Sequence, residues 1–144
     1  MALVKVMLVD ADVGFVEATG RRLATRGLEV VRAFSGQEAL DRLAAEEDID
    51  IVILGVCGPN NEGTDVLRRI KASHPLVEII LVVDQKAVDA AIHGMRLGAY
   101  DFIMKPFDMD QLTAKVAEAE SRKAAQEEKI LSALMRRITL DGSL

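Results

Sequence analysis

Five short runs of apolar residues recur along the chain, and most of them are rich in Val and Ile. Their length and composition are typical of β-strands, and they cover residues 4–9, 29–33, 51–54, 78–83 and 101–104. Most of these runs are continuously apolar and do not alternate with polar residues. Strands of this kind are buried on both faces, as in a parallel sheet that helices cover on either side.

The stretches between these runs are predicted to be helices, at residues 13–26, 35–46, 63–73 and 88–97. Most of them stop at or shortly before a residue that commonly ends helices, namely Gly27, Pro75 and Gly98. Strict alternation of strand and helix implies right-handed crossovers between parallel strands. We therefore predict a doubly wound α/β domain of the flavodoxin-like type, with five strands in the order 2-1-3-4-5 and functional residues just after the strands.

Composition and charge narrow this picture. The chain has 144 residues, of which 50% are apolar, so we expect one domain with a core of its own. A net charge of −5 argues against non-specific binding to nucleic acid or to an anionic membrane surface. Cys57 is the only cysteine and lies far from both histidines, so we expect neither a disulfide within the chain nor a metal finger, and we expect a cytoplasmic protein.

Distinctive motifs stand at three of the predicted strand ends. The first strand ends in Leu-Val-Asp-Ala-Asp at residues 8–12, and the third is followed by Pro59 and Gly63. The fifth lies within Leu-Gly-Ala-Tyr-Asp-Phe-Ile-Met-Lys-Pro-Phe-Asp at residues 97–108. Together, and in this spacing, the motifs resemble the receiver domains of two-component response regulators over residues 4 to about 118. The resemblance also implies a cis peptide bond before Pro106.

The resemblance assigns roles to positions. In a working receiver, an aspartate after the third strand accepts a phosphoryl group and an acidic pair after the first strand holds magnesium. A Ser or Thr after the fourth strand and a Lys after the fifth bind the phosphoryl oxygens. In this chain the resemblance places the acceptor at Gly55, the acidic pair at Asp10 and Ala11, the hydroxyl at Val83 and the lysine at Lys105.

Three of these five positions have lost their chemistry. Gly55 has no side chain that could form an acyl phosphate, so phosphotransfer at the usual site is not expected. Magnesium needs near-octahedral oxygen ligands, and Ala11 and Gly55 remove both carboxylates that would touch it, leaving the Cys57 carbonyl and the more distant Asp10. We therefore expect no cofactor, and weak or absent magnesium binding. Val83 has no hydroxyl, so the usual coupling to the switch aromatic, Phe102, has no trigger.

Several acidic and basic residues keep two interpretations. Asp10 and Lys105 are remnants of the phosphorylation site that could equally form a structural ion pair. Asp12 is predicted to cap the first helix, and Asp84 to open an Asx turn after the fourth strand. Either of these two aspartates is also a candidate for a displaced phosphoryl acceptor.

The end of the chain predicts a long helix. A core-facing apolar stripe begins after Met109, and a polar stretch follows at residues 120–129. A second apolar group then appears at helical spacing: Ile130, Leu131, Leu134, Met135 and Ile138. We predict a receiver-like domain over residues 1–118 and a helical extension over 119–144. The extension is either the cut linker to an output domain or a helix that binds a second chain, and its exposed apolar residues favour association.

The expected function is that of a phosphorylation-independent receiver that binds protein partners through its fourth helix, fifth strand and fifth helix, with a homodimer as a further possibility. An enzyme is not expected, because no nucleophile, base and oxyanion donor converge in the sequence. Two alternatives remain open. One is a phosphorelay receiver with a displaced acceptor, and the other is the regulatory piece of a larger transcriptional regulator, since the tail resembles the linker after receivers of the nitrogen-regulation type.

Overall fold

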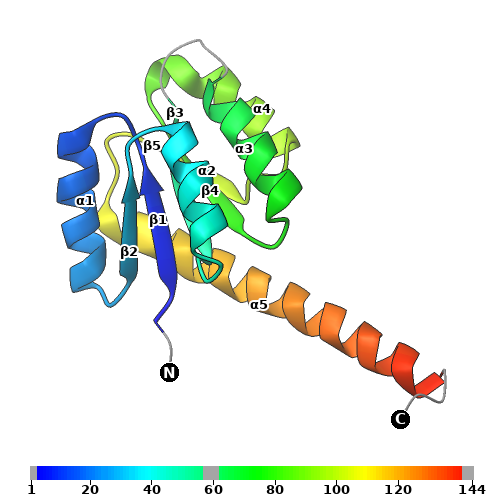
Figure 1. The fold of residues 1–144 in the computed structure, drawn as a ribbon. Helices are drawn as coiled ribbons and strands as arrows, with labels where there is room; N and C mark the ends of the chain where they lie inside the picture. Colours follow the sequence, from blue (N-terminus) through cyan, green and yellow to red (C-terminus); the bar gives the residue numbers. More distant parts are fainter. Residues whose placement is uncertain (1–2, 57–61, 141–144) are drawn as a thin grey trace.

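Five parallel strands form a single sheet in the order β2-β1-β3-β4-β5 in the computed structural model, which describes residues 3–56 and 62–140 (Figure 1). The strands are β1 (Lys5–Val9), β2 (Glu29–Ala33), β3 (Ile51–Val56), β4 (Glu78–Val83) and β5 (Asp101–Met104). The predicted flavodoxin-like fold and strand order are confirmed. β3 runs two residues past its predicted end, because Gly55 and Val56 stay paired with β4.

Helices cover both faces of this sheet. They are α1 (Val13–Thr25), α2 (Gly36–Ala45), α3 (Glu62–Ser73), α4 (Val88–Arg96) and α5 (Met109–Leu140), with a short 3-10 helix η1 (Gln85–Ala87) before α4. α1 and α5 lie on one face, and α2, α3 and α4 lie on the other (Figure 1). Alternate residues of each central strand enter the two cores, Val6 and Leu8 on the α1 side and Met7 and Val9 on the other. This double burial explains why the strands are continuously apolar.

Local sequence signals define the helix ends. Asp12 caps α1 by accepting a hydrogen bond from the Phe15 backbone N–H at 3.1 Å, as predicted. Gly27 and Gly98 follow α1 and α4 with φ angles of 89° and 107°. Glycine is favoured at both positions because a side chain strains this left-handed backbone conformation.

α5 is one continuous helix of 32 residues that extends well beyond the sheet (Figure 1). Its buried residues are Leu112, Val116 and Ala119. The predicted domain boundary after residue 118 therefore falls inside a helix, with no break in the backbone at that point. No helix in the described part of the chain is both long and apolar enough to cross a membrane.

Candidate functional site

Asp10 and Lys105 lie together at the carboxyl ends of the strands. Asp10 directly follows β1 and is only 5% exposed, while Lys105 directly follows β5. The Lys105 ammonium lies 3.2 Å from Asp10 Oδ2, and Asp10 Oδ1 accepts a hydrogen bond from the Asp12 backbone N–H at 2.9 Å. Both carboxylate oxygens of this buried group are therefore bound. The bond between Lys105 and Pro106 is cis, as the resemblance implied.

Lys105 has a second partner on α1. Its ammonium lies 3.9 Å from the centre of the Phe15 ring, a distance at which a cation is attracted to the face of an aromatic ring. The Phe15 ring in turn meets Phe107 edge-on, with 6.1 Å between the ring centres. The lysine is thus held between a carboxylate and an aromatic face.

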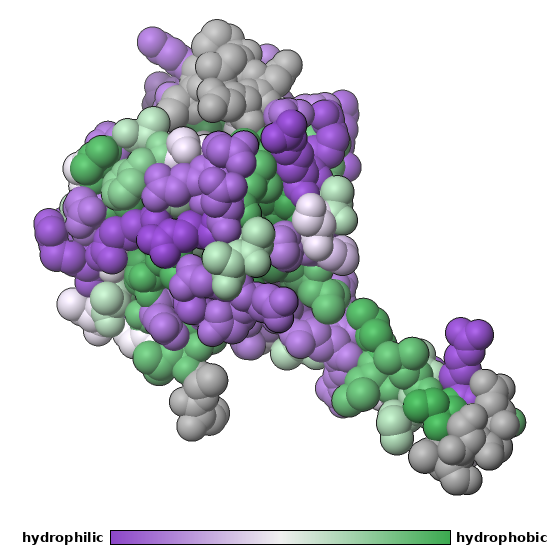
Figure 2. All heavy atoms as spheres, viewed as in Figure 1, coloured by the Kyte–Doolittle hydropathy of each residue, from purple (hydrophilic) through white to green (hydrophobic). Residues whose placement is uncertain are grey.

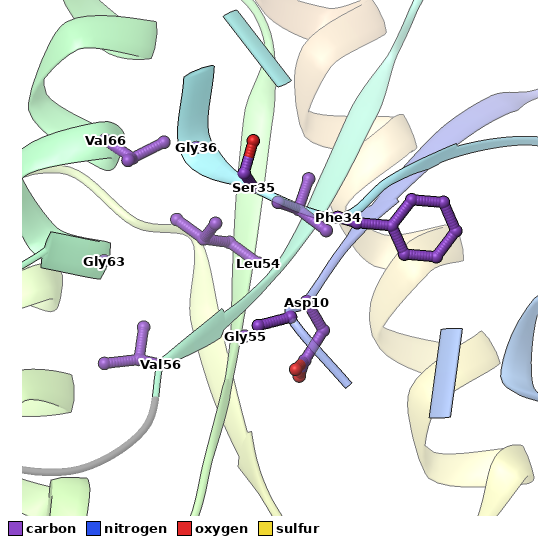
Figure 3. Close-up of a pocket in the computed structure, with 11 residues that line it drawn as sticks. Asp10, Phe34, Ser35, Gly36, Leu54, Gly55, Val56, Gly63 and Val66 are labelled. Atoms are coloured by element: carbon purple, nitrogen blue, oxygen red, sulfur yellow. The ribbon is translucent and has the colours of Figure 1, made fainter. Parts of the chain in front are cut away.

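Gly55 lies on the strand next to Asp10, and the two residues approach closely (Figure 3). A Cβ atom added to Gly55 would lie 2.7 Å from Asp10 Cγ and would overlap Asp10 Oδ2. Real Cβ atoms essentially never come within 3.0 Å of another heavy atom. The Asp10 carboxylate therefore occupies the space in which any side chain at residue 55 would begin.

A hollow of about 340 Å³ opens beside Gly55, between the ends of β1 and β3 and the starts of α2 and α3 (Figure 3). Its described lining is largely apolar or glycine, and Asp10 provides its one described carboxylate. The Ser35 hydroxyl oxygen accepts a hydrogen bond of 3.1 Å from the Glu38 backbone N–H and so caps α2. The hollow thus has neither a free nucleophile nor a set of hard oxygen ligands among the described residues.

The other positions named by the resemblance carry no polar group at this site. Ala11 is exposed, and Val83 is fully buried in the core beneath α2, α3 and α4. The described residues at this site therefore do not fit a magnesium ion, which needs several hard oxygen ligands. In residues 3–56 and 62–140, no three His, Cys, Asp or Glu side chains are grouped closely enough to hold a metal ion. Cys57 and Pro59, which the sequence analysis singled out, lie outside the described residues.

The two alternative acceptors both cap helices. Asp12 caps α1, and Asp84 caps η1 by accepting a hydrogen bond from the Lys86 backbone N–H at 2.9 Å. The short η1 helix explains why an aspartate follows β4, which sequence reasoning left without a firm purpose.

Apolar side chains are exposed on α4 and the neighbouring strand β5. Phe102, the predicted switch aromatic, is 38% exposed. Four further exposed apolar residues lie on the same two elements, and we call the five together the α4–β5 face: Val88, Ile92, Met95 and Met104. Groups of exposed apolar residues often mark binding surfaces, whereas isolated ones do not.

A second exposed apolar group lies on the part of α5 that extends beyond the sheet, where Figure 2 shows apolar atoms gathered along the helix. We call this group the distal stripe: Ile130, Leu131, Leu134, Met135 and Ile138. The first four are about half exposed, and Ile138 is less exposed. Eleven residues are about three turns of α-helix, so Ile130 and Leu134 continue the side of α5 on which Ala119 and Lys123 lie.

Comparison with known protein sequences shows similarity to response regulators. The family model of the response regulator receiver domain matches residues 6–117. The DNA-binding transcriptional regulator NtrC of Escherichia coli (strain K12) is 32% identical over 123 residues, which cover 85% of this chain and 26% of NtrC. The transcriptional regulatory protein CpxR of the same strain is 32% identical over 112 residues, covering 78% of this chain and 47% of CpxR.

Solved structures give the same result. A response regulator receiver domain protein from Clostridium thermocellum superposes with a TM-score of 0.81 at 29% identity, covering 86% of this chain and 99% of that one. NtrX from Brucella abortus superposes with a TM-score of 0.80 at 27% identity, covering 92% of this chain and 30% of NtrX. The chain thus spans well under two thirds of NtrC and of NtrX.

Proposed function

Because the chain belongs to the response regulator receiver domain family of two-component systems, we propose that it acts by binding protein partners and accepts no phosphoryl group at the usual site. The observation that carries this proposal is the pair formed by Gly55 and Asp10. Gly55, where the resemblance places the family's acceptor, has no side chain, and the neighbouring Asp10 carboxylate fills the space where one would stand.

The charges around the site support the same proposal. In the family, the lysine after the fifth strand binds phosphoryl oxygens. Here the Lys105 ammonium is already matched by the buried Asp10 carboxylate. A phosphoryl group would have to displace that carboxylate, which burial makes costly to leave unpaired.

Exposure to a small phosphoryl donor is expected to leave the chain unmodified. After incubation with acetyl phosphate and magnesium, the intact mass should show no phosphoryl adduct, because Gly55 cannot form an acyl phosphate and both Asp12 and Asp84 are bound as helix caps. An adduct that disappears in Asp12→Asn or in Asp84→Asn would instead establish a displaced acceptor. A related receiver with its acceptor aspartate serves as the positive control.

The α4–β5 face is the proposed docking surface for a partner protein. It places Phe102, Ile92 and Met95 in contact with solvent without any covering element in the described chain. Receiver domains bind partner proteins in signalling, and we propose that this chain does so through this face without a phosphorylation trigger.

The distal stripe is proposed to bring two copies of the chain together. Its apolar side chains lie beyond the sheet and have no described partner within the chain. A second copy presents the same stripe, so the two can cover each other symmetrically.

The low coverage of NtrC, 26%, also supports the alternative that the chain is the regulatory part of a larger transcriptional regulator whose linker is α5.

Leu134→Glu is expected to weaken this association strongly. Each dimer would lose two leucines that are about half exposed in the single chain, so their burial in the dimer is worth about 0.8–1.5 kcal/mol each. The dissociation constant should therefore rise by about one to two orders of magnitude. Light scattering at tens of micromolar, about the range of weak association, compares the parent, this variant and Ser132→Glu. The control adds the same charge to an exposed site off the stripe. A monomeric parent chain would remove the homodimer proposal.

A further inference from the structure

We infer that two ion pairs at the amino-terminal edge of the sheet clamp α5 to the domain as far as Lys123. The part of α5 that carries the distal stripe therefore projects from the domain in one fixed direction. The residues involved are Glu78 and Asp50 on the domain, and Arg122 and Lys123 on the helix. The inference concerns a single chain and holds whether or not the extension dimerises.

Glu78 is the first anchor. It begins β4 and is only 2% exposed, although it carries a carboxylate. Burying a charge is costly unless an opposite charge accompanies it. Arg122 Nε lies 3.1 Å from Glu78 Oε2, and Lys71 Nζ from α3 lies 3.5 Å from Glu78 Oε1. The Oε2 contact is an ion pair without a described hydrogen bond, so its strength is electrostatic.

Tyr100 reinforces the position of Arg122. The guanidinium carbon lies 5.7 Å from the centre of the Tyr100 ring, within the range of a cation–π contact. The Tyr100 hydroxyl donates a hydrogen bond of 3.3 Å to Glu118, one turn earlier on α5. Burial raises the pKa of the Tyr100 hydroxyl, and the Glu118 carboxylate raises it further, so the hydroxyl keeps the proton it donates.

Asp50 is the second anchor, directly before the neighbouring strand β3. Lys123 Nζ lies 3.3 Å from Asp50 Oδ1, while Asp50 Oδ2 accepts a hydrogen bond of 2.9 Å from the Lys5 backbone N–H. Burial alone would lower the pKa of the Lys123 ammonium, but hydrogen bonds to Glu127 and Asp50 outweigh burial and raise it. Lys123 is therefore charged at neutral pH, as the ion pair requires.

Two anchors at separate places constrain the helix more than one would. Arg122 and Lys123 are adjacent on α5, and their partners stand at the first residue of β4 and directly before β3. The buried residues of α5 end at Ala119, and beyond that point two contacts at separate places oppose tilt and rotation of the helix better than one contact would. Beyond Glu127 the described side-chain hydrogen bond, from Thr139 to the Met135 carbonyl, stays within the helix. The clamp thus ends close to where the distal stripe begins.

The spacing of residues on α5 fits this division. Lys123 lies eleven residues after Leu112 and eleven before Leu134, which is about three helical turns in each direction. It therefore continues the row of α5 that faces the sheet, at the point where the sheet ends. Lys123, which lies in the polar stretch between the two apolar groups of α5, thus contacts the domain.

Distances between spin labels in one chain test the clamp. Labels at Gln37→Cys on α2 and Ser132→Cys on α5 are introduced with Cys57→Ser, and the labelled chain is diluted into excess unlabelled chain so that only distances within a chain are recorded. We expect a narrow distance distribution for the otherwise unchanged chain. Arg122→Gln with Lys123→Gln should broaden it by about twofold or more, as the helix gains slow collective motion.

Matched variants make the result decisive. Lys129→Gln with Arg136→Gln removes the same charge from exposed positions beyond the clamp and should leave the distribution narrow. Glu78→Gln with Asp50→Asn removes the anchors from the domain side and should broaden it; if that chain does not fold, the helix-side pair decides. A broad distribution in the unchanged chain overturns the inference, and so does a narrow one after loss of Arg122 and Lys123. Light scattering reports on dimerisation separately.

Discussion

Gly55→Ala is expected to lower the free energy of unfolding by about 2–4 kcal/mol, although it adds only a methyl group. The new Cβ would overlap the Asp10 carboxylate, so Asp10 would have to turn away. It would then lose the Lys105 ammonium and the hydrogen bond from the Asp12 backbone N–H. A buried charge without partners is among the most destabilising defects in a fold. Equilibrium unfolding in urea measures the change.

Two controls tie this loss to Asp10. Gly14→Ala adds a methyl group in α1, where the nearest described atom is an Asp12 oxygen at 3.5 Å, and should be neutral or stabilising by up to about 1 kcal/mol. Combining Gly55→Ala with Asp10→Ala removes the overlapping carboxylate, so the two losses should not add, with a coupling of about 1 kcal/mol or more. A Gly55→Ala chain as stable as the parent would show that the Asp10 carboxylate does not occupy this space.

Restoring the family's carboxylates should create a magnesium site. Ala11→Asp with Gly55→Asp would supply the two ligands that touch the ion directly in the family. Asp10 stands nearby, but its carboxylate must first move out of the space that the new side chain needs. Without magnesium the double variant should therefore be less stable than the parent, through both the overlap and the repulsion among three carboxylates.

Magnesium should reverse much of that loss. A site with a dissociation constant of about 1 mM would gain about 1.4 kcal/mol at roughly 10 mM magnesium. Calorimetric titration should detect binding to the double variant, little to Gly55→Asp alone and none to the parent in the same range. A folded double variant that binds no magnesium would mean that Asp10 and the strand ends are not arranged as in working receivers.

The sequence predicted most of the fold because its signals are local. Continuous apolar strands identify a sheet buried on both faces, and Gly27 and Gly98 mark helix ends where the backbone turns left-handed. The end of β3 was missed by two residues, since Gly55 and Val56 are held in the strand by pairing with β4. Such pairing is a property of two segments and leaves no signature in either one.

Only part of the site was predicted, because some of its contacts also join segments that are distant in the sequence. Motif positions brought Asp10 and Lys105 together, and the structure places them 3.2 Å apart. The sequence showed what Gly55 lacks but could not show what fills the space beside it. Lys123 was missed as a contact altogether, because its partner Asp50 is far away in the chain and a lysine in a polar stretch resembles ordinary surface.

Because α5 extends far beyond Lys123, a small tilt of the helix at the edge of the sheet produces a larger displacement at the end of the helix. Leu140 lies seventeen residues after Lys123, about 25 Å at 1.5 Å per residue. A tilt of about 10° at Lys123 would carry the helix tip roughly 4 Å sideways, close to the spacing between packed side chains. A partner protein bound to the end of α5 would therefore be displaced by a tilt at the domain that is too small to alter the fold.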